Sequence, residues 1–414
     1  MNEVGRRKKQ VTIVALVTAL CLLGDSMLYI TLPIFYEQVG LQSLWEVGLL
    51  LSINRFVRIP MNPLVGFMYR KFQLKTGLYI AVVLAVITTV GYGIGTGLFI
   101  WVLLRLLWGI AWSFLRLGGF FTILHASTDR NRGENMGRYN GLYRLGSLGG
   151  MIGGGVLVSM IGFQPTVIAF GLSMVIGIPL VYKGITKNPS QNLVVTPEIT
   201  PKKKVFFGLT CKAITTITSG MILAFLIQGM FNSSISLVMV MHFGEEISLY
   251  RWTIGITALA GTLQGVRWLW EPYLAVRLGR VSDGEQGRLP LFLLALVVSA
   301  MGFVFIPIPL PLAIWLGMIL FVMAASTTLT TLVDALTSDE AQGQDANRLM
   351  TIYSVFLDLG AAMGPLVSYF LFSIGGTVVH VFNGAAVVFM MLFVYWSAIY
   401  FQTKKEQHKA SINV

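Results

Sequence analysis

Residues 101–116 read WVLLRLLWGIAWSFLR, an apolar and aromatic stretch that contains Arg105 and Arg116. The two arginines are 11 positions apart, close to three turns of an α-helix, so a helix places both on one face, with Trp108 and Trp112 near it. A cation at the centre of a bilayer costs at least about 2.5–3.5 kcal/mol unless it is paired or hydrated. We therefore expect this face to meet a wet cavity, a carboxylate or an anionic ligand rather than lipid.

The composition is that of a polytopic membrane protein. Of the 414 residues, 55% are hydrophobic and 12% are charged, and the mean hydropathy is +0.74, whereas a soluble domain has about 25% charged residues. The net charge of +12 does not indicate nucleic-acid binding, because the excess Lys and Arg lie in short loops. Cys21 and Cys211 are too few and too far apart for a disulfide framework or a zinc site.

Twelve apolar segments are long enough to cross a membrane, which takes about 20 residues. They cover residues 11–35, 46–67, 77–97, 99–122, 139–160, 164–182, 213–241, 252–274, 289–307, 311–333, 351–372 and 377–400. The first follows MNEVGRRKKQ and has no cleavage site, so we interpret it as a span and not a signal peptide. Residues 183–210, rich in Pro and Lys, predict a linker between two halves of six spans, 1–182 and 211–414.

Lys and Arg concentrate at both termini and in the loops that follow the second, fourth, sixth and eighth spans. The opposite loops are nearly free of them. Cytoplasmic loops carry this excess, so the pattern predicts a multi-pass protein of the cell membrane with both termini in the cytoplasm.

The two halves share a pattern. Arg58 precedes Pro63 by five residues in the second span, as Arg267 precedes Pro272 in the eighth. Gly149-Gly150 with Gly153 in the fifth span corresponds to Gly364-Pro365 in the eleventh. Matches in the same order at similar offsets indicate an internal repeat, a plan common among secondary transporters.

Three motifs, with the plan of six spans, linker and six spans, resemble the major facilitator superfamily over essentially the whole chain. Arg105-Leu-Leu-Trp108-Gly109 is similar to its R-x-x-Q-G motif, with Trp in place of Gln. Gly149-Gly150-Met-Ile-Gly153-Gly154 is similar to its antiporter motif G-P-x-x-G-G, with Gly in place of Pro. Gly66-Phe-Met-Tyr-Arg70-Lys71 is similar to its G-x-L-x-D-R loop motif, with Arg70 in place of the Asp.

This resemblance implies an all-α membrane protein with 12 transmembrane helices in two pseudo-symmetric six-helix bundles. It also implies a secondary transporter that works by alternating access. Arg105 stands where the family has an arginine implicated in proton coupling and conformational switching. The glycine motif is associated in the family with export by antiport.

Two acids lie in the middle of predicted spans: Asp25 in the first, one turn before Tyr29, and Asp358 in the eleventh. Ionisable residues inside a membrane usually face the bundle interior and serve function. We expect Asp25 and Asp358 to bind coupling protons; a structural ion pair with an arginine is the alternative for Asp25. Glu271, near a cytoplasmic end, is expected to form a gate or a helix-end salt bridge.

Interior arginines outnumber these acids: Arg55, Arg58, Arg105, Arg116, Arg144 and Arg267. Arginine binds carboxylate and phosphate in a bidentate manner, so the excess predicts a substrate with an anionic group. We assign Arg55, Arg116 and Tyr29 to substrate binding, and Arg58, Arg70, Arg267 and Glu271 to gating. The alternative for Arg58 and Arg144 is that they extend to the cytoplasmic face.

Polar amides and aromatic rings complete the expected site. Gln228 and Asn232 are four residues apart, so an α-helix places both on one face, where they line a cavity or bond a neighbouring helix. Trp108 and Trp112 can stack a ligand or belong to the core. Gly149, Gly150, Gly153 and Gly364 are expected to let helices approach closely, and Pro365 permits a bend.

We find no nucleotide-binding, metal-binding or hydrolase motif, so we expect no cofactor, no metal and no enzyme, and an ion gradient as the energy source. The sequence predicts a monomeric, proton-coupled exporter of a small amphiphilic or anionic compound such as a drug, a siderophore or a metabolite. Import of an organic anion or lipid flipping on the same fold is the alternative. A membrane enzyme is a third alternative, but it would need a constellation of catalytic residues, and the sequence shows none.

Overall fold

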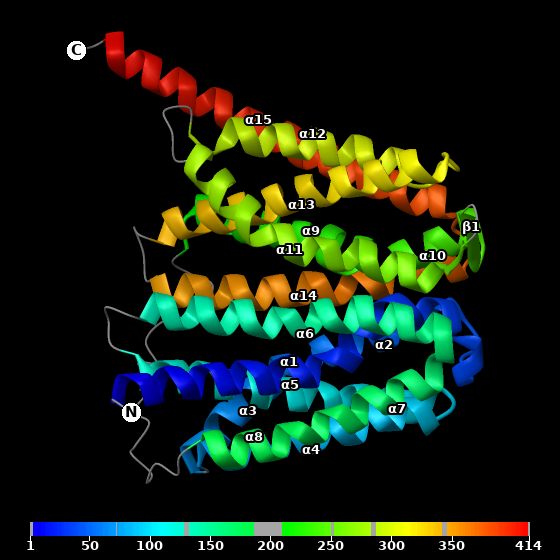
Figure 1. The fold of residues 1–414 in the computed structure, drawn as a ribbon. Helices are drawn as coiled ribbons and strands as arrows, with labels where there is room; N and C mark the ends of the chain where they lie inside the picture. The colour runs from blue at the N-terminus through cyan, green and yellow to red at the C-terminus, as the bar shows by residue number, and fades with distance from the viewer. Residues whose placement is uncertain are drawn as a thin grey trace. The chain divides into compact units, whose positions relative to one another are not determined.

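The computed structural model describes residues 3–71, 73–127, 132–185, 209–249, 252–282, 287–341 and 346–412, and these are almost entirely helical. In chain order the elements are α1 (Glu3–Phe35), η1 (Glu37–Val39), α2 (Leu44–Phe56), α3 (Arg58–Lys71), α4 (Leu74–Ile94), α5 (Leu98–Ala126), α6 (Arg132–Ile161), α7 (Phe163–Ser173), η2 (Met174–Ile176), α8 (Gly177–Gly184), α9 (Cys211–Leu223), η3 (Ala224–Phe231), α10 (Asn232–Phe243), β1 (Glu246–Leu249), β2 (Trp252–Gly255), α11 (Ile256–Ser282), α12 (Leu289–Phe305), α13 (Leu312–Ala341), α14 (Ala346–Ser373) and α15 (Val378–Ile412) (Figure 1).

Each of the twelve predicted spans overlaps one or more of these helices. Within the described ranges, nine helical segments are long and apolar enough to cross a membrane: Arg7–Phe35, Leu74–Ile94, Leu98–Ala126, Glu134–Ile161, Phe163–Gly184, Cys211–Phe243, Leu312–Glu340, Arg348–Ser373 and Val378–Gln402. The α12 helix is apolar but shorter, with 17 residues. The second and eighth predicted spans differ, because one is broken and the other, α11, carries Gln264, Arg267 and Glu271 within its apolar run.

The second span is two helices and not one. The α2 helix ends at Phe56 and α3 begins at Arg58, with Val57 between them. Pro60 explains the break, because a proline ring clashes with the carbonyl group four residues earlier, here that of Phe56, and supplies no N–H to bond it. Pro63 lies inside α3.

The eighth span was predicted to begin at residue 252, and this boundary is wrong. Residues 252–255 form strand β2, which pairs antiparallel with β1, and α11 begins at Ile256. The β-branched Ile247, Thr253 and Ile254 favour the extended backbone of this hairpin.

The seventh span contains a π-helix. Between α9 and α10, residues Ala224–Phe231 (η3) pair their backbone groups five residues apart. π-Helices are rare and frequently occur at functional sites. The π-helix packs against α14 where two glycines meet: a Cβ on Gly364 would overlap the Cα of Gly229.

The chain divides into two compact units. The first comprises Met1–Val205 with Asn232–Trp268, and the second comprises Phe206–Phe231 with Leu269–Val414. The units therefore do not follow the sequence halves, since Asn232–Trp268 packs with the first. Most of the expected linker, 183–210, lies outside the described residues, so the division into 1–182 and 211–414 stays a prediction.

In the first unit, α1 makes its most extensive contacts with α6. A Cβ on Gly146 or Gly150 would overlap backbone atoms of Ala19 or Leu23 in α1, and one on Gly154 would overlap the Met27 side chain. These three glycines recur every four residues and form one stripe on α6, along which the two helices meet. The buried core beside them includes Val14, Cys21, Ala81, Trp108 and Leu115.

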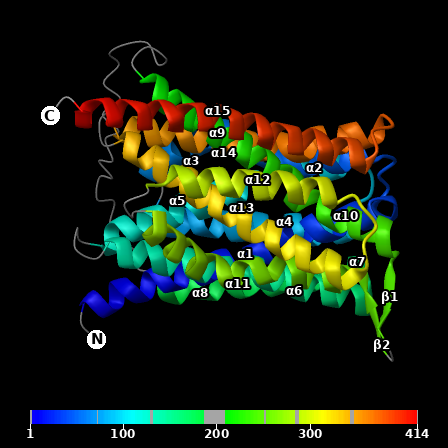
Figure 2. The same ribbon diagram turned by 90° about the horizontal axis from the view of Figure 1, so that it is seen from above.

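In the second unit, Phe303 of α12 lies at the centre of an aromatic cluster. Its ring centroid is 5.4 Å from that of Phe231, 5.6 Å from that of Phe382 and 4.9 Å from that of Phe389. The cluster joins η3, α12 and α15. Helices α12 and α15 pack against each other (Figure 1). Figure 2 shows the two strands of the β1–β2 hairpin side by side.

Candidate functional site

Asp25 of α1 and Arg105 of α5 form a buried ion pair. The Nη1 atom of Arg105 donates to Oδ1 of Asp25 at 2.5 Å, with Arg105 fully buried and Asp25 6% exposed. The Nε atom of Arg105 also donates to the carbonyl oxygen of Leu50 in α2, at 2.8 Å. One guanidinium therefore joins α5 both to α1, another helix of membrane-spanning length, and to the shorter α2.

The surroundings of the pair are polar. Asn54 of α2 donates from Nδ2 to Oδ1 of Asp25 at 3.4 Å. The Nη2 atom of Arg105, Oδ1 of Asn54 and Oγ of Ser52 are buried and have no hydrogen-bond partner among the described residues. Buried polar groups in proteins are nearly always hydrogen-bonded to protein or to ordered water. The unpartnered atoms of Arg105 and Asn54, which both bond Asp25, can therefore bond water next to its carboxylate.

Tyr29 and Arg55 lie beside the pair. Tyr29 is one turn beyond Asp25 on α1, and its hydroxyl group accepts a hydrogen bond from Nε of Arg55 at 3.4 Å. Tyr29 is 9% exposed and Arg55 is half-buried. Asp25, Tyr29, Asn54, Arg55 and Arg105 thus converge, and Asn54 is the member that the sequence reasoning missed.

Three arginines of the first unit lie over aromatic rings. The guanidinium of Arg58 lies over the Trp112 ring, 5.2 Å from its centroid, and that of Arg144 lies 5.5 Å from the centroid of Trp268. Arg116 lies 5.9 Å from the Phe120 ring centroid on its own helix. Trp108 is fully buried in the core, as the packing alternative expects, so it presents no surface for stacking a ligand.

Arg267 and Asn232 form a direct contact that the sequence did not predict. Nη1 of Arg267 in α11 donates to Oδ1 of Asn232 at the start of α10, at 2.9 Å. Gln228 lies in the π-helix, and the argument that it shares a face with Asn232 does not apply, because that argument assumes the pitch of an α-helix.

Three acids of the second unit lie on three different helices. Asp358 is half-buried in α14, and Glu271 is half-buried in α11. Asp334 of α13 accepts a hydrogen bond from the Tyr353 hydroxyl of α14 at 2.5 Å. The sequence did not predict this contact, because no local pattern around Tyr353 indicates a carboxylate partner 19 residues away.

The sequence model of the Major Facilitator Superfamily matches residues 14–345. This chain belongs to the Major Facilitator Superfamily. The predicted family and the all-α membrane fold are confirmed. Membership of this superfamily establishes that the protein is a multi-pass membrane transporter.

A solved structure shares the superfamily fold over nearly the whole chain. It is a bacterial homolog of the human lysosomal transporter Spinster in an inward-facing, unoccupied conformation, and it has a TM-score of 0.71 at 13% identity. The match covers 97% of each chain. A search of curated proteins finds no match.

The superfamily motifs have distinct structural settings in this member. Gly109 of the arginine motif lies against the backbone of Asn54, so α5 and α2 meet closely there. In the glycine motif, Gly150 lies against the backbone of Leu23, whereas a Cβ on Gly149 would be 3.3 Å from a Leu23 side-chain atom and one on Gly153 would make an ordinary contact of 3.8 Å with Phe170. Close packing is therefore not the role of Gly153.

The remaining predicted gating residues are spread over both units. Arg70 is exposed in the last turn of α3. Gly364 and Pro365 are buried in α14, where Gly364 lies against the π-helix. Among the residues that the structure describes, no group of three or more His, Cys, Asp or Glu side chains has the arrangement of a metal site.

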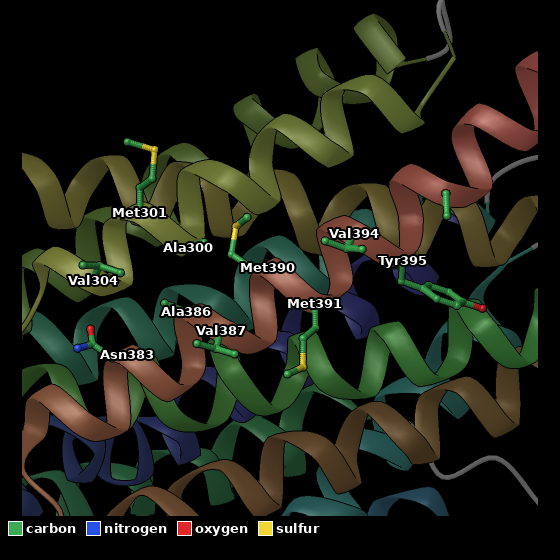
Figure 3. A pocket seen from close by; sticks show the side chains of 11 residues that line it. Ala300, Met301, Val304, Asn383, Ala386, Val387, Met390, Met391, Val394 and Tyr395 are labelled. Atoms are coloured by element: carbon green, nitrogen blue, oxygen red, sulfur yellow. The ribbon is translucent and has the colours of Figure 1, made fainter.

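A groove of about 990 Å³ lies between α12 and α15 of this superfamily member (Figure 3). Its lining is apolar, with Met301, Met390 and Met391 among it, and Asn383 and Tyr395 supply its polar atoms. None of the predicted site residues lines this groove.

Proposed function

We propose that this transporter is proton-coupled and exports a small amphiphilic or anionic compound by alternating access. The observation that supports the proposal most strongly is the buried pair of Asp25 and Arg105, with polar atoms around it that can bond water. We place the protein in the cell membrane as a monomer, with both termini in the cytoplasm on the evidence of loop charge.

Within the pair, the exchangeable proton belongs to Asp25. Arginine stays protonated in proteins, so the carboxylate is the member whose charge changes. When Asp25 binds a proton, its ionic attraction to Arg105 is lost, while the hydrogen bond from Arg105 to Leu50 stays. Protonation thereby loosens α5 from α1 and leaves it attached to α2, which couples proton binding to helix movement.

The charge of the other interior residues supports an anionic substrate. Arg116 and Arg144 are half-buried on membrane-length helices of the first unit, and Arg55 is half-buried on the shorter α2. Guanidinium groups favour carboxylate and phosphate partners. The basic cytoplasmic loops would raise the local concentration of such anions on the side from which an exporter loads. Asp358 remains a candidate for a second proton site.

The test uses purified protein in liposomes with an imposed pH gradient and a panel of amphiphilic carboxylates. The wild-type protein should move its substrate across the membrane in the direction opposite to the proton flow. It should also exchange labelled for unlabelled substrate when no pH gradient is present. Asp25→Asn should keep exchange and lose the response to the gradient. Full gradient-driven transport by Asp25→Asn would refute the proposal.

Direction is read from the same vesicles. Movement of the compound opposite to the protons indicates antiport and export, as proposed. Movement in the direction of the protons would identify an importer of an organic anion, and movement of labelled lipid between leaflets would identify a flippase.

A further inference from the structure

A cavity of about 160 Å³ lies within the second unit, between the π-helix η3, α14 and α15. Its lining includes buried side chains from all three segments, whereas Leu371, His380 and Gly384 are exposed. Each of the three segments belongs to a span long and apolar enough to cross a membrane. None of the predicted site residues lines this cavity. We call it the π-helix pocket.

The π-helix forms one wall of the pocket through Phe225, Leu226 and Met230. The backbone of η3 pairs residues that are five apart, so Phe225 and Met230 lie one turn from each other on one side of the helix. A turn with one residue fewer, as in an α-helix, would rotate Met230 away from its present direction. The shape of the pocket therefore depends on the π-helical form of this segment.

Gly384 leaves the pocket open on the side of α15. It lies one turn after His380 and one turn before Val388, and all three line the pocket, so they share the face of α15 that is turned toward it. A Cβ on Gly384 would have no heavy atom within 4 Å. The glycine thus leaves room at this position, and a large side chain there would occupy the pocket.

The side chains that line the pocket are apolar except for those of Ser368 and His380. The hydroxyl group of Ser368 donates to the carbonyl oxygen of Gly364 within α14, at 2.9 Å. The Nδ1 atom of His380 lies 2.7 Å from Oγ1 of Thr377, and Nε2 has no hydrogen-bond partner among the described residues. His380 is therefore the lining side chain that can bond a polar atom of a bound molecule.

The size and the lining of the pocket suit a single aromatic ring with one neutral polar group. An apolar cavity of about 150 Å³ is large enough to bind benzene. A charged group would lose its hydration against the apolar lining, at a high cost in free energy. A hydroxyl group can donate to Nε2 of His380 or accept from it, so it suits either tautomer of the imidazole.

We propose that the π-helix pocket binds a neutral phenol with a single ring, with the ring against Leu226 and Met230 and the hydroxyl group on His380. A bound phenol stabilises the π-helical form of η3, because that form supplies one wall of its site. The site is separate from the residues assigned to transport, and this inference does not depend on the proposed function.

Binding of 4-fluorophenol to the full-length protein in lipid nanodiscs tests the pocket, with fluorine NMR as the readout. Empty nanodiscs give the concentration of each compound in the bilayer, to which affinities are referred. The comparison compounds are 4-fluorotoluene, which has a methyl group in place of the hydroxyl, and 6-fluoro-2-naphthol, which has two rings. We expect 4-fluorophenol to bind about two- to tenfold more tightly than 4-fluorotoluene, the ratio that one hydrogen bond gives.

Two results with these compounds would overturn the ligand class. Equal affinity for 4-fluorophenol and 4-fluorotoluene would show that the pocket takes apolar groups alone, as a lipid chain supplies them, and that His380 does not bond the hydroxyl group. Tighter binding of 6-fluoro-2-naphthol than of 4-fluorophenol would show that the site is larger than one ring.

Substitutions locate the site. Gly384→Leu should abolish binding of 4-fluorophenol, because the leucine side chain would occupy the pocket. The matched control is Gly317→Leu in α13, where an added Cβ also has no atom within 4 Å, and it should bind as wild type does. His380→Phe keeps a planar ring and removes both nitrogens, so it should bind 4-fluorophenol and 4-fluorotoluene equally. Unchanged binding of 4-fluorophenol by Gly384→Leu would overturn the assignment to this pocket.

Amide hydrogen exchange of the wild-type protein tests the site without any substitution. Saturating 4-fluorophenol should slow exchange across Ala224–Phe231 at least about twofold, because the bound ring stabilises the hydrogen bonds of this wall. Exchange in α13, which does not line the pocket, should stay the same. Unchanged exchange across Ala224–Phe231 would show that the compound does not bind beside the π-helix.

Discussion

The hydroxyl group of Thr257 donates a hydrogen bond to the carbonyl oxygen of Gly155 at 3.1 Å and joins α11 to α6. The Oγ1 atom of Thr257 also lies 2.6 Å from Oγ of Ser159. The two helices meet backbone to backbone, since a Cβ on Gly261 would overlap the carbonyl oxygen of Met151. If the protein works by alternating access, this contact between residues far apart in the sequence must open during the transport cycle.

Thr257→Val should favour the state in which α6 and α11 are apart. The substitution keeps the branched shape and removes both hydroxyl contacts, and a hydrogen bond contributes about 0.5–1.5 kcal/mol. We expect the population with the contact closed to fall about two- to tenfold. Spin labels at the exposed Met160 and Thr253, in a background without Cys21 and Cys211, would report the distance distribution.

Thr262→Val is the control for that measurement. Thr262 is exposed on the same helix, and its hydroxyl group bonds the carbonyl oxygen of Ala258 within α11. Its distance distribution should match that of wild type. An equal shift in both variants would mean that the Thr257 contact does not set the equilibrium.

Gly150→Ala should destabilise the protein by about 1–3 kcal/mol, because the added methyl group would overlap the Leu23 backbone and force α1 away from α6. Gly153→Ala should be neutral or stabilising by up to about 1 kcal/mol. Its methyl group would make only an ordinary contact with Phe170, and alanine favours the helical conformation more than glycine does. Thermal unfolding of the two variants in the same detergent makes the comparison. Equal melting temperatures would contradict the stripe of close contact.

Gly364→Ala should lower stability by a similar amount, since the new methyl group would overlap Gly229 and the carbonyl oxygen of Phe225 in the π-helix. The control is Gly317→Ala in α13, where an added Cβ has no atom within 4 Å. Denaturant titration followed by far-UV circular dichroism gives both values. A stable Gly364→Ala variant would show that the π-helix moves easily away from α14.

A double-mutant cycle should detect strong coupling between Asp25 and Arg105. Removing one partner of a buried ion pair leaves the other charge uncompensated, at about 3–5 kcal/mol. We expect Asp25→Asn and Arg105→Gln each to destabilise the protein by that amount, and the double variant to lose clearly less than the sum. Additive losses would show that the two side chains do not interact in the membrane-embedded protein.

The spans and the ion pair were accessible to sequence reasoning, because both follow from the cost of polar groups in a bilayer. That cost predicts about 20 apolar residues per crossing and a partner for Arg105, and Asp25 was one of few candidates. The break in the second span at Val57 could also have been predicted from Pro60. The apolar segment around Pro60 was instead interpreted as one continuous helix.

Other features depend on contacts that no local pattern records. The π-helix at Ala224–Phe231 is accommodated by Gly364 of α14, more than 130 residues later. The strand at residues 252–255 exists because β1 pairs with it, and its residues also fit an apolar span. The contacts of Asn232 with Arg267 and of Tyr353 with Asp334 likewise arise from tertiary packing.

The π-helix places one more residue in its helical turn than an α-helix does, and it ends immediately before Asn232 in the seventh span. If its backbone groups changed partners from five residues apart to four, α10 would advance by one residue, which in an α-helix is a rotation of about 100° and a shift of about 1.5 Å. Such a screw movement would carry Asn232 out of reach of Arg267 without breaking the helix. The seventh span would thus change its register by one residue while it stayed helical.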